Sequence, residues 1–80
     1  MMTTSLTTNQ LEVLRLMRTA GGGWYPLNST WVVGDNQTTH RLCRELAQRG
    51  FVECVGGDPE GAFVCDWRLT RAGLAEVQAL

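Results

Sequence analysis

The chain has 80 residues, an apolar content of 44% and a formal net charge of −1, which together predict one small globular domain over residues 1–80 and exclude general disorder. A domain of this size buries only about 60 to 65% of its unfolded surface, so there is little room for a deep substrate pocket and no enzyme is expected. No apolar run approaches the roughly 20 residues that span a bilayer, and the start does not resemble a signal peptide. We therefore expect a cytoplasmic protein without membrane contact, with residues 1–5 flexible.

The first predicted helix begins after Thr7. Thr7 and Gln10 have the spacing of a capping box, and Leu6 can pack as a hydrophobic staple against the first turn. An apolar stripe at helical spacing follows, made of Leu11, Val13, Leu14 and Met17. Three consecutive glycines at residues 21–23 end the helix, because glycine readily adopts the left-handed conformation found there.

The segment before the second long helix is less regular. We expect a short edge strand over residues 24–27, since Pro26 lacks the amide proton that a central strand needs. A brief helix is expected over residues 28–33, with Asn28 as its cap. The large side chains of Trp24 and Trp31 are expected in the core, because so small a domain needs bulky apolar groups.

The second long helix is predicted over residues 37–49, with Thr38 or a neighbouring residue as its cap and Gly50 at its end. Its buried side is predicted to consist of Thr39, Leu42, Cys43 and Leu46. The opposite side carries Gln37, His40 or Arg41, Arg44 and Gln48. Residues 36–50 hold three arginines against one glutamate, a local charge of +2. This side is therefore either a nucleic-acid contact surface or an ordinary solvated helix face.

Residues 52–69 predict a β-hairpin whose tip is GGDPEG. Asp58, Pro59 and Gly61 suit the first, second and fourth positions of a type I turn. Centring the hairpin on this turn pairs Val55 with Val64, Cys54 with Cys65, and Val52 with Trp67. Alternation then places one set of residues on the core face: Val52, Cys54, Phe63, Cys65, Trp67 and Leu69.

Two further features belong to this half of the chain. Residues 53–66 carry four acidic residues and no basic one, a local charge of −4, with Asp58 and Glu60 at the tip. A last helix is expected after Thr70, with Leu74 and Val77 turned inward.

The three cysteines, Cys43, Cys54 and Cys65, are odd in number and lack a CxxC spacing. A disulfide framework or a zinc site therefore has little support, and no metal or cofactor is expected. In a reducing cytoplasm we expect all three to be small thiols without a disulfide.

Three motifs in order resemble one family. The run LTTNQLEVL, the run RLCRELAQRGFVE and, after the hairpin, WRLTRAG resemble the DNA-binding core of MarR-type winged helix-turn-helix regulators. The resemblance covers most of residues 6–74. It implies an α+β fold with three helices, a β-hairpin wing and a short C-terminal helix, and it implies contact with double-stranded DNA.

The resemblance also implies which residues touch DNA. In that family the second helix of the motif enters the major groove, and the matching positions here are Gln37, Thr38, Thr39, His40, Arg41 and Arg44. The chemistry of several side chains agrees, because arginine can bind guanine and glutamine can bind adenine through paired hydrogen bonds.

Two departures from the family pattern leave alternatives open. The long helices through which MarR-type proteins form dimers have no counterpart here, so a homodimer stays undecided. The tip offers Asp58 and Glu60 where the family's wing usually offers arginine or lysine, and like charge repels phosphate. The first hypothesis is a compact DNA-binding regulator. The second is a winged helix used for protein interaction, such as a phage-encoded inhibitor similar to anti-CRISPR proteins, whose acidic wing binds a basic surface of a host complex.

An enzymatic role has the least support. His40 is the only histidine, and it has no carboxylate spaced to orient it as a general base. As a metal ligand, it would need Cys43 to turn away from the predicted apolar stripe. We therefore predict no catalytic residues.

Overall fold

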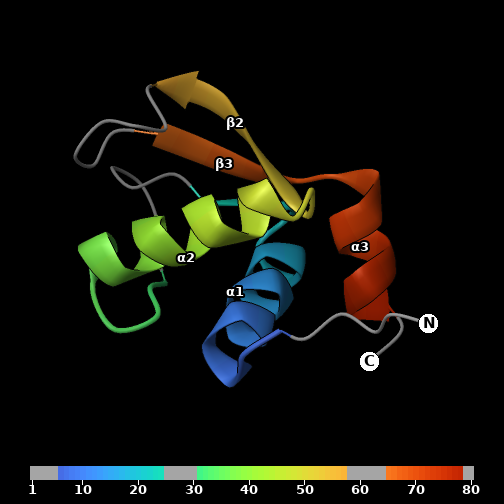
Figure 1. The fold of residues 1–80 in the computed structure, drawn as a ribbon, viewed down its shortest axis with the longest axis horizontal. Helices are drawn as coiled ribbons and strands as arrows, with labels where there is room; N and C mark the ends of the chain where they lie inside the picture. The colour runs from blue at the N-terminus through green and yellow to red at the C-terminus, as the bar shows by residue number, and fades with distance from the viewer. Residues whose placement is uncertain (1–5, 25–30, 58–64, 79–80) are drawn as a thin grey trace.

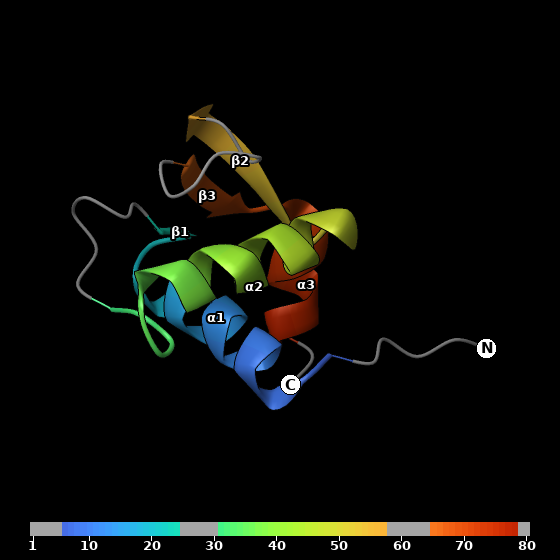
Figure 2. The ribbon, with the colours of Figure 1, turned by 60° about the vertical axis from the view of Figure 1, so that its left-hand side comes forward.

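The computed structural model describes residues 6–24, 31–57 and 65–78. In chain order, these residues form α1 (Thr8–Thr19), β1 (Gly23–Trp24), α2 (Asn36–Gln48), β2 (Val52–Gly57), β3 (Cys65–Leu69) and α3 (Arg71–Gln78). The strands make one antiparallel sheet in the order β1-β3-β2. Figures 1 and 2 show α1 and α2 on the same side of the hairpin strands, with α3 beside α1. The described residues thus confirm a small α+β fold.

The start of α1 is the predicted one. The Thr7 hydroxyl accepts a hydrogen bond from the Gln10 backbone amide at 3.1 Å, and the Gln10 side chain accepts one from the Thr7 amide at 3.0 Å. The buried apolar side chains are Val13, Leu14 and Met17, while Leu11 is only half-buried. Both capping partners lie within one turn, so local sequence is enough to specify this end.

The segment around β1 matches only part of its prediction. β1 pairs at the edge of the sheet with β3, and Trp24 is fully buried, with its ring nitrogen donating to the Trp31 carbonyl at 3.0 Å. The helix expected over residues 28–33 is wrong for residues 31–33, which are not helical, and residues 28–30 lie outside the described parts of the chain. The core position of Trp24 is confirmed, and Trp31 packs partly buried against the core.

The hairpin register differs from the prediction by two residues before Val55 and by three after it. Val52 pairs with Leu69 and Cys54 with Trp67, and a bulge at Val55 then brings Gly56 opposite Asp66. The prediction counted residues evenly from the turn and had no signal for a bulge. Because side chains alternate with a period of two, the predicted core face survives a shift of two residues. Val52, Cys65 and Trp67 are buried as expected.

The expectation of three thiols without a disulfide is wrong for two of them. Cys54 and Cys65 form a disulfide between β2 and β3, and their Cα atoms lie 6.3 Å apart, within the usual range for such a bond. Cys43 is free and buried in α2, and burial raises the pKa of its thiol far above the ordinary value. The prediction for Cys43, a small buried thiol, is confirmed.

The last helix is capped as predicted but rotated. The Thr70 hydroxyl accepts from the Gly73 amide at 3.1 Å, and Val77 is buried. Leu74, however, is 39% exposed, and Gly73 faces inward in its place. A Cβ atom on Gly73 would overlap the Phe51 carbonyl oxygen, so the backbones approach more closely than any side chain allows. This close approach explains why Leu74 points outward.

Some predictions concern residues that the structure does not describe. They are the flexibility of residues 1–5, the strand over residues 25–27, the turn and acidic tip at residues 58–61 with Asp58 and Glu60, the pairing of Val64, and the core position of Phe63. Within the described ranges, no helix is long and apolar enough to cross a membrane.

Candidate nucleic-acid interface

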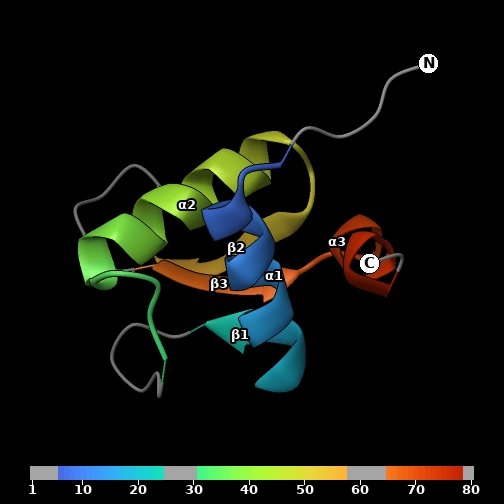
Figure 3. The ribbon, with the colours of Figure 1, turned by 90° about the horizontal axis from the view of Figure 1, so that it is seen from below.

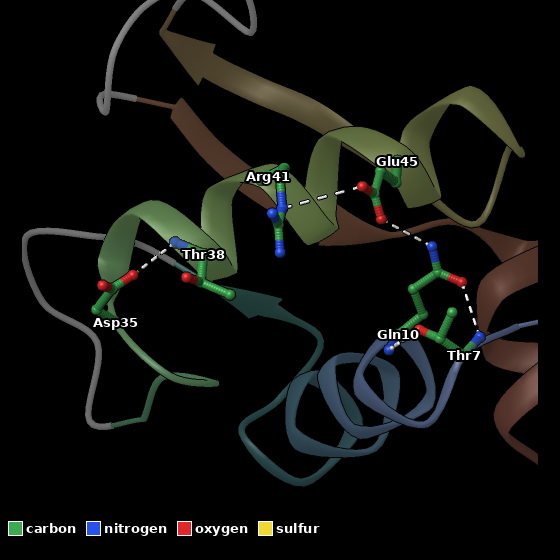
Figure 4. A network of polar contacts seen from close by, with 6 residues as sticks. All are labelled: Thr7, Gln10, Asp35, Thr38, Arg41 and Glu45. Carbon is green, nitrogen blue, oxygen red and sulfur yellow. Dashed lines mark hydrogen bonds and ion pairs between the residues drawn. The ribbon is translucent and has the colours of Figure 1, made fainter.

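The N-terminus of α2 is held by Asp35. Its carboxylate accepts a hydrogen bond from the Thr38 backbone amide at 2.7 Å (Figure 4), so Asp35 and not Thr38 is the cap. The same bond to Thr38 lowers the pKa of Asp35, because it stabilises the ionised carboxylate. A negative charge therefore already occupies the end of the helix where a phosphate would otherwise bind.

Thr39 is buried and is not available to DNA. Its hydroxyl donates to the Asp35 carbonyl at 2.8 Å and accepts from the Val33 amide at 2.8 Å. These bonds fasten the preceding loop to the first turn of α2. Thr39 therefore belongs to the buried side of the helix, as its spacing indicated, and its assignment as a DNA contact is wrong.

His40 is also on the buried side. Only 4% of its surface is exposed, and its Nδ1 accepts from the Trp67 ring nitrogen at 3.4 Å, with the two rings tilted against each other. Its Nε2 has no hydrogen-bond partner among the described residues. The assignment of His40 as an exposed DNA contact is therefore wrong, because β3 brings Trp67 against this side of α2.

The opposite side of α2 presents four long polar side chains. Gln37, Arg41, Arg44 and Gln48 follow one another at intervals of four, three and four residues, which keeps them on one face of the helix. All are exposed except Arg44, which is half-buried. We call this set the α2 row. Each member can make paired hydrogen bonds with a planar partner.

Glu45 connects the α2 row to α1 (Figure 4). One carboxylate oxygen lies 4.0 Å from Arg41 Nε, and the other accepts from the Gln10 side chain at 2.9 Å. The Arg41 and Glu45 side chains are 60% and 44% exposed, so the ion pair is weak and water competes with it. Arg41 can leave Glu45 for a stronger partner while Gln10 keeps the carboxylate in place.

A shallow hollow of about 350 Å³ separates α2 from β2. Arg44 and Gln48 border it from the helix, and Glu53, Cys54 and Trp67 border it from the sheet. Glu53 pairs with Arg68 across the hairpin at 2.9 Å, which offsets part of the acidic charge predicted for the hairpin. Two charged side chains therefore border the hollow. Among the described residues, Arg44 makes no ion pair, and the charge of Glu53 is balanced by Arg68.

The six predicted contact residues divide into two groups. Gln37, Thr38, Arg41 and Arg44 lie at the surface, whereas Thr39 and His40 lie in the interior. Sequence reasoning placed Gln48 on the polar face but left it out of the site, although its spacing from Arg44 was a sufficient signal. The roles of Asp35 and Glu45 had weaker signals, since each depends on the loop or on α1. In the described residues, no three His, Cys, Asp or Glu side chains converge to hold a metal ion.

No family model, no curated protein and no solved structure matches the chain. The resemblance to winged-helix regulators therefore depends on the sequence motifs and on the order of elements α1, β1, α2, β2, β3 and α3.

Proposed function

We propose that this protein is a small winged-helix DNA-binding protein that acts as a transcriptional regulator. It contacts the major groove with the α2 row. The observation that carries the proposal is the row itself. Gln37, Arg41, Arg44 and Gln48 lie on one helix face, where three of the side chains are exposed and Arg44 is half-buried beside the hollow next to β2. Arginine pairs with guanine and glutamine with adenine, so every member suits a base edge.

The dimensions of the row fit a DNA groove. From Gln37 to Gln48 the helix rises by about 16 Å, which corresponds to roughly five base pairs at 3.4 Å each. An α-helix fits the major groove, whose width is about 12 Å. Thr38 is half-buried at the start of α2, next to Gln37 in sequence. In this proposal its hydroxyl contacts the sugar-phosphate backbone.

The charge distribution predicts a particular kind of binding. Arg41 and Arg44 are opposed on the same helix by Asp35 and Glu45, and the whole chain has a net charge of −1. Attraction to phosphate is therefore small, and affinity depends mainly on contacts with bases. We expect the logarithm of the binding constant to fall with the logarithm of salt concentration with a slope no steeper than about −2.

Substitutions in the row test the proposal. Arg44→Ala and Arg41→Ala should each weaken binding to the preferred duplex by about 1 to 3 kcal/mol. A pool of random duplexes, selected for binding and followed by fluorescence anisotropy across a salt series, supplies the measurement. The free energy of unfolding should change by less than about 0.5 kcal/mol in either variant, because both side chains are at the surface.

Arg15→Ala is the matched control. It removes the same charge from α1, outside the α2 row, and should leave binding within about twofold of the parent. If Arg15→Ala weakens binding as much as Arg44→Ala, the row has no special role. If no duplex binds even at low salt, the DNA hypothesis fails and the second hypothesis, interaction with a protein through the wing, takes precedence.

A further inference from the structure

A second surface feature lies between α1 and α3. Two hollows of about 300 and 400 Å³ share Arg18 as a common border. One is lined by Arg15, Thr19 and Val77, and the other by the 21–22 turn, Arg68, Leu69 and Leu74. We call the two together the α1–α3 furrow. None of the residues of the α2 row lines it.

The apolar lining of the furrow is a consequence of how α3 packs. Gly73 lies against the Phe51 carbonyl oxygen, and this contact fixes the rotation of the helix. Leu74 is consequently turned into the furrow, where it is 39% exposed and adds to the apolar surface of Leu69. Leu74 and Leu69 therefore give the furrow an apolar side next to Arg18 and Arg68.

Among the residues that the structure describes, the charged side chains that line the furrow are all arginines: Arg15, Arg18 and Arg68. Arg68 forms an ion pair with Glu53 at 2.9 Å. Within the described ranges, neither Arg15 nor Arg18 makes an ion pair. The furrow therefore combines an apolar lining with two positive groups that lack an acidic partner there.

From this combination we propose that the α1–α3 furrow binds an acidic segment of a partner protein. Carboxylates of the segment pair with Arg15 and Arg18, and an apolar side chain between them packs on Leu74 and Leu69. Complementary charge favours such a partner and disfavours a basic one. Arginine suits this role because its guanidinium group can bind a carboxylate with two parallel hydrogen bonds.

The furrow and the α2 row belong to different parts of the surface. Figure 3 shows α2 along one side of the molecule, with the C-terminal end of α1 and β1 on the other side and α3 at the edge. A partner in the furrow would leave the α2 row open. The inference does not depend on the proposed function, since it uses none of the same side chains.

A designed peptide provides the probe. It is a blocked helical peptide with leucine at helical spacing and glutamate elsewhere, titrated into the isotope-labelled full chain and followed by amide chemical shifts. We expect saturable shifts at Gly21, Gly22, Leu74 and Val77, with the amides of Gln37 and Arg41 unchanged. Arg18→Glu should weaken binding about tenfold, since it replaces an attractive charge by a repulsive one.

The controls separate this site from general charge attraction. Arg44→Glu makes the same charge change on α2 and should alter the affinity less than about twofold. Leu74→Ser should weaken binding several-fold, and so should peptides with glutamine for glutamate or serine for leucine. Arg18 and Leu74 are both at the surface, so their variants should stay folded.

Three results would overturn the proposal. The first is a peptide that does not bind at millimolar concentration. The second is an equal loss of affinity in Arg18→Glu and Arg44→Glu, which would indicate attraction without a site. The third is duplex DNA that shifts the same amides and loses affinity in Arg18→Glu, which would make the furrow a nucleic-acid surface.

Discussion

The helices on either side of the hairpin, α2 before it and α3 after it, are held in different ways. α2 buries five side chains along one face, among them Thr39, His40 and Leu46. α3 buries only Gly73 and Val77, and its position depends on contact between backbones at Phe51. Buried side chains and their hydrogen bonds thus hold α2 in place. α3 is held by a close backbone contact that is possible only because Gly73 has no side chain.

This difference decides what each helix presents at the surface. The buried face of α2 uses all of its apolar residues except Ala47, so the exposed face is polar and charged. The inward face of α3 is occupied partly by glycine, so a leucine remains outside. α2, which is held by its buried side chains, therefore presents a polar surface. α3, which is held by its backbone, leaves Leu74 exposed.

The largest expected effect removes the side chain that packs against α2. Trp67→Ala should lower the free energy of unfolding by about 3 to 5 kcal/mol, because the buried ring contacts His40 and its loss leaves a cavity. Chemical denaturation followed by circular dichroism measures the change. Val55→Ala, at an exposed position of the neighbouring strand, should change stability by less than about 0.5 kcal/mol. Equal effects of the two substitutions would contradict the account of α2.

The second effect tests the backbone contact of α3. Gly73→Ala should lower the free energy of unfolding by about 1 to 3 kcal/mol, because the new methyl group overlaps the Phe51 carbonyl and the helix must move. Thermal unfolding gives the magnitude, and the amide shifts of α3 show whether it moves. Gly56→Ala is the matched control, since its Cβ would meet only the Asp66 side chain at an ordinary distance. If Gly73→Ala does not change the stability, a methyl group fits between α3 and Phe51, and the close contact is not required.

The smallest effect is at the capped end of α2 and depends on pH. The pKa of Asp35 is lowered in the folded protein by its bond to the Thr38 amide, so its contribution to stability is present above the ordinary value of 3.8. That contribution is lost as the pH falls through the lower, folded value. Parent and Asp35→Ala should therefore differ in stability near pH 6 and converge in acid.

A neutral cap controls for the charge of Asp35. The variant Asp35→Asn retains a capping oxygen but has no ionisable group at this position, so its cap should not weaken in acid. Urea denaturation from pH 6 down to about pH 2 measures all three proteins. A constant difference between parent and Asp35→Ala across this range would contradict the assigned hydrogen bond.

Features that depend on neighbours in the chain could be predicted from sequence. The Thr7 and Gln10 capping box, the Thr70 cap and the apolar stripe of α2 all follow from spacings of a few residues, and all are confirmed. Alternation likewise identified the core face of the hairpin, although its register was wrong by two residues before Val55 and by three after it. Period and capping chemistry are local properties, so a single sequence reveals them.

Features that depend on distant contacts could not be predicted. His40 looked like a surface residue because nothing near it in sequence indicates that Trp67 will cover it. Leu74 looked like a core residue because helical spacing does not reveal that Phe51 lies against Gly73. The predicted exposure was accordingly right for Gln37 and Arg41, and Arg44 is half-buried. It was wrong for His40, whose partner Trp67 comes from the sheet.

The central position of β3 has a consequence for how the chain folds during synthesis. β3 is the last strand in the sheet by sequence, yet both other strands pair with it, Gly23 with Arg68 and Val52 with Leu69. While a ribosome extends the chain, β1 and β2 have no partner in this sheet until residues 65–69 have emerged. α1 and α2 can form earlier, but the sheet closes only in a late and nearly simultaneous step. Emergence of residues 65–69, more than growth of the segments before them, should therefore trigger closure of the sheet.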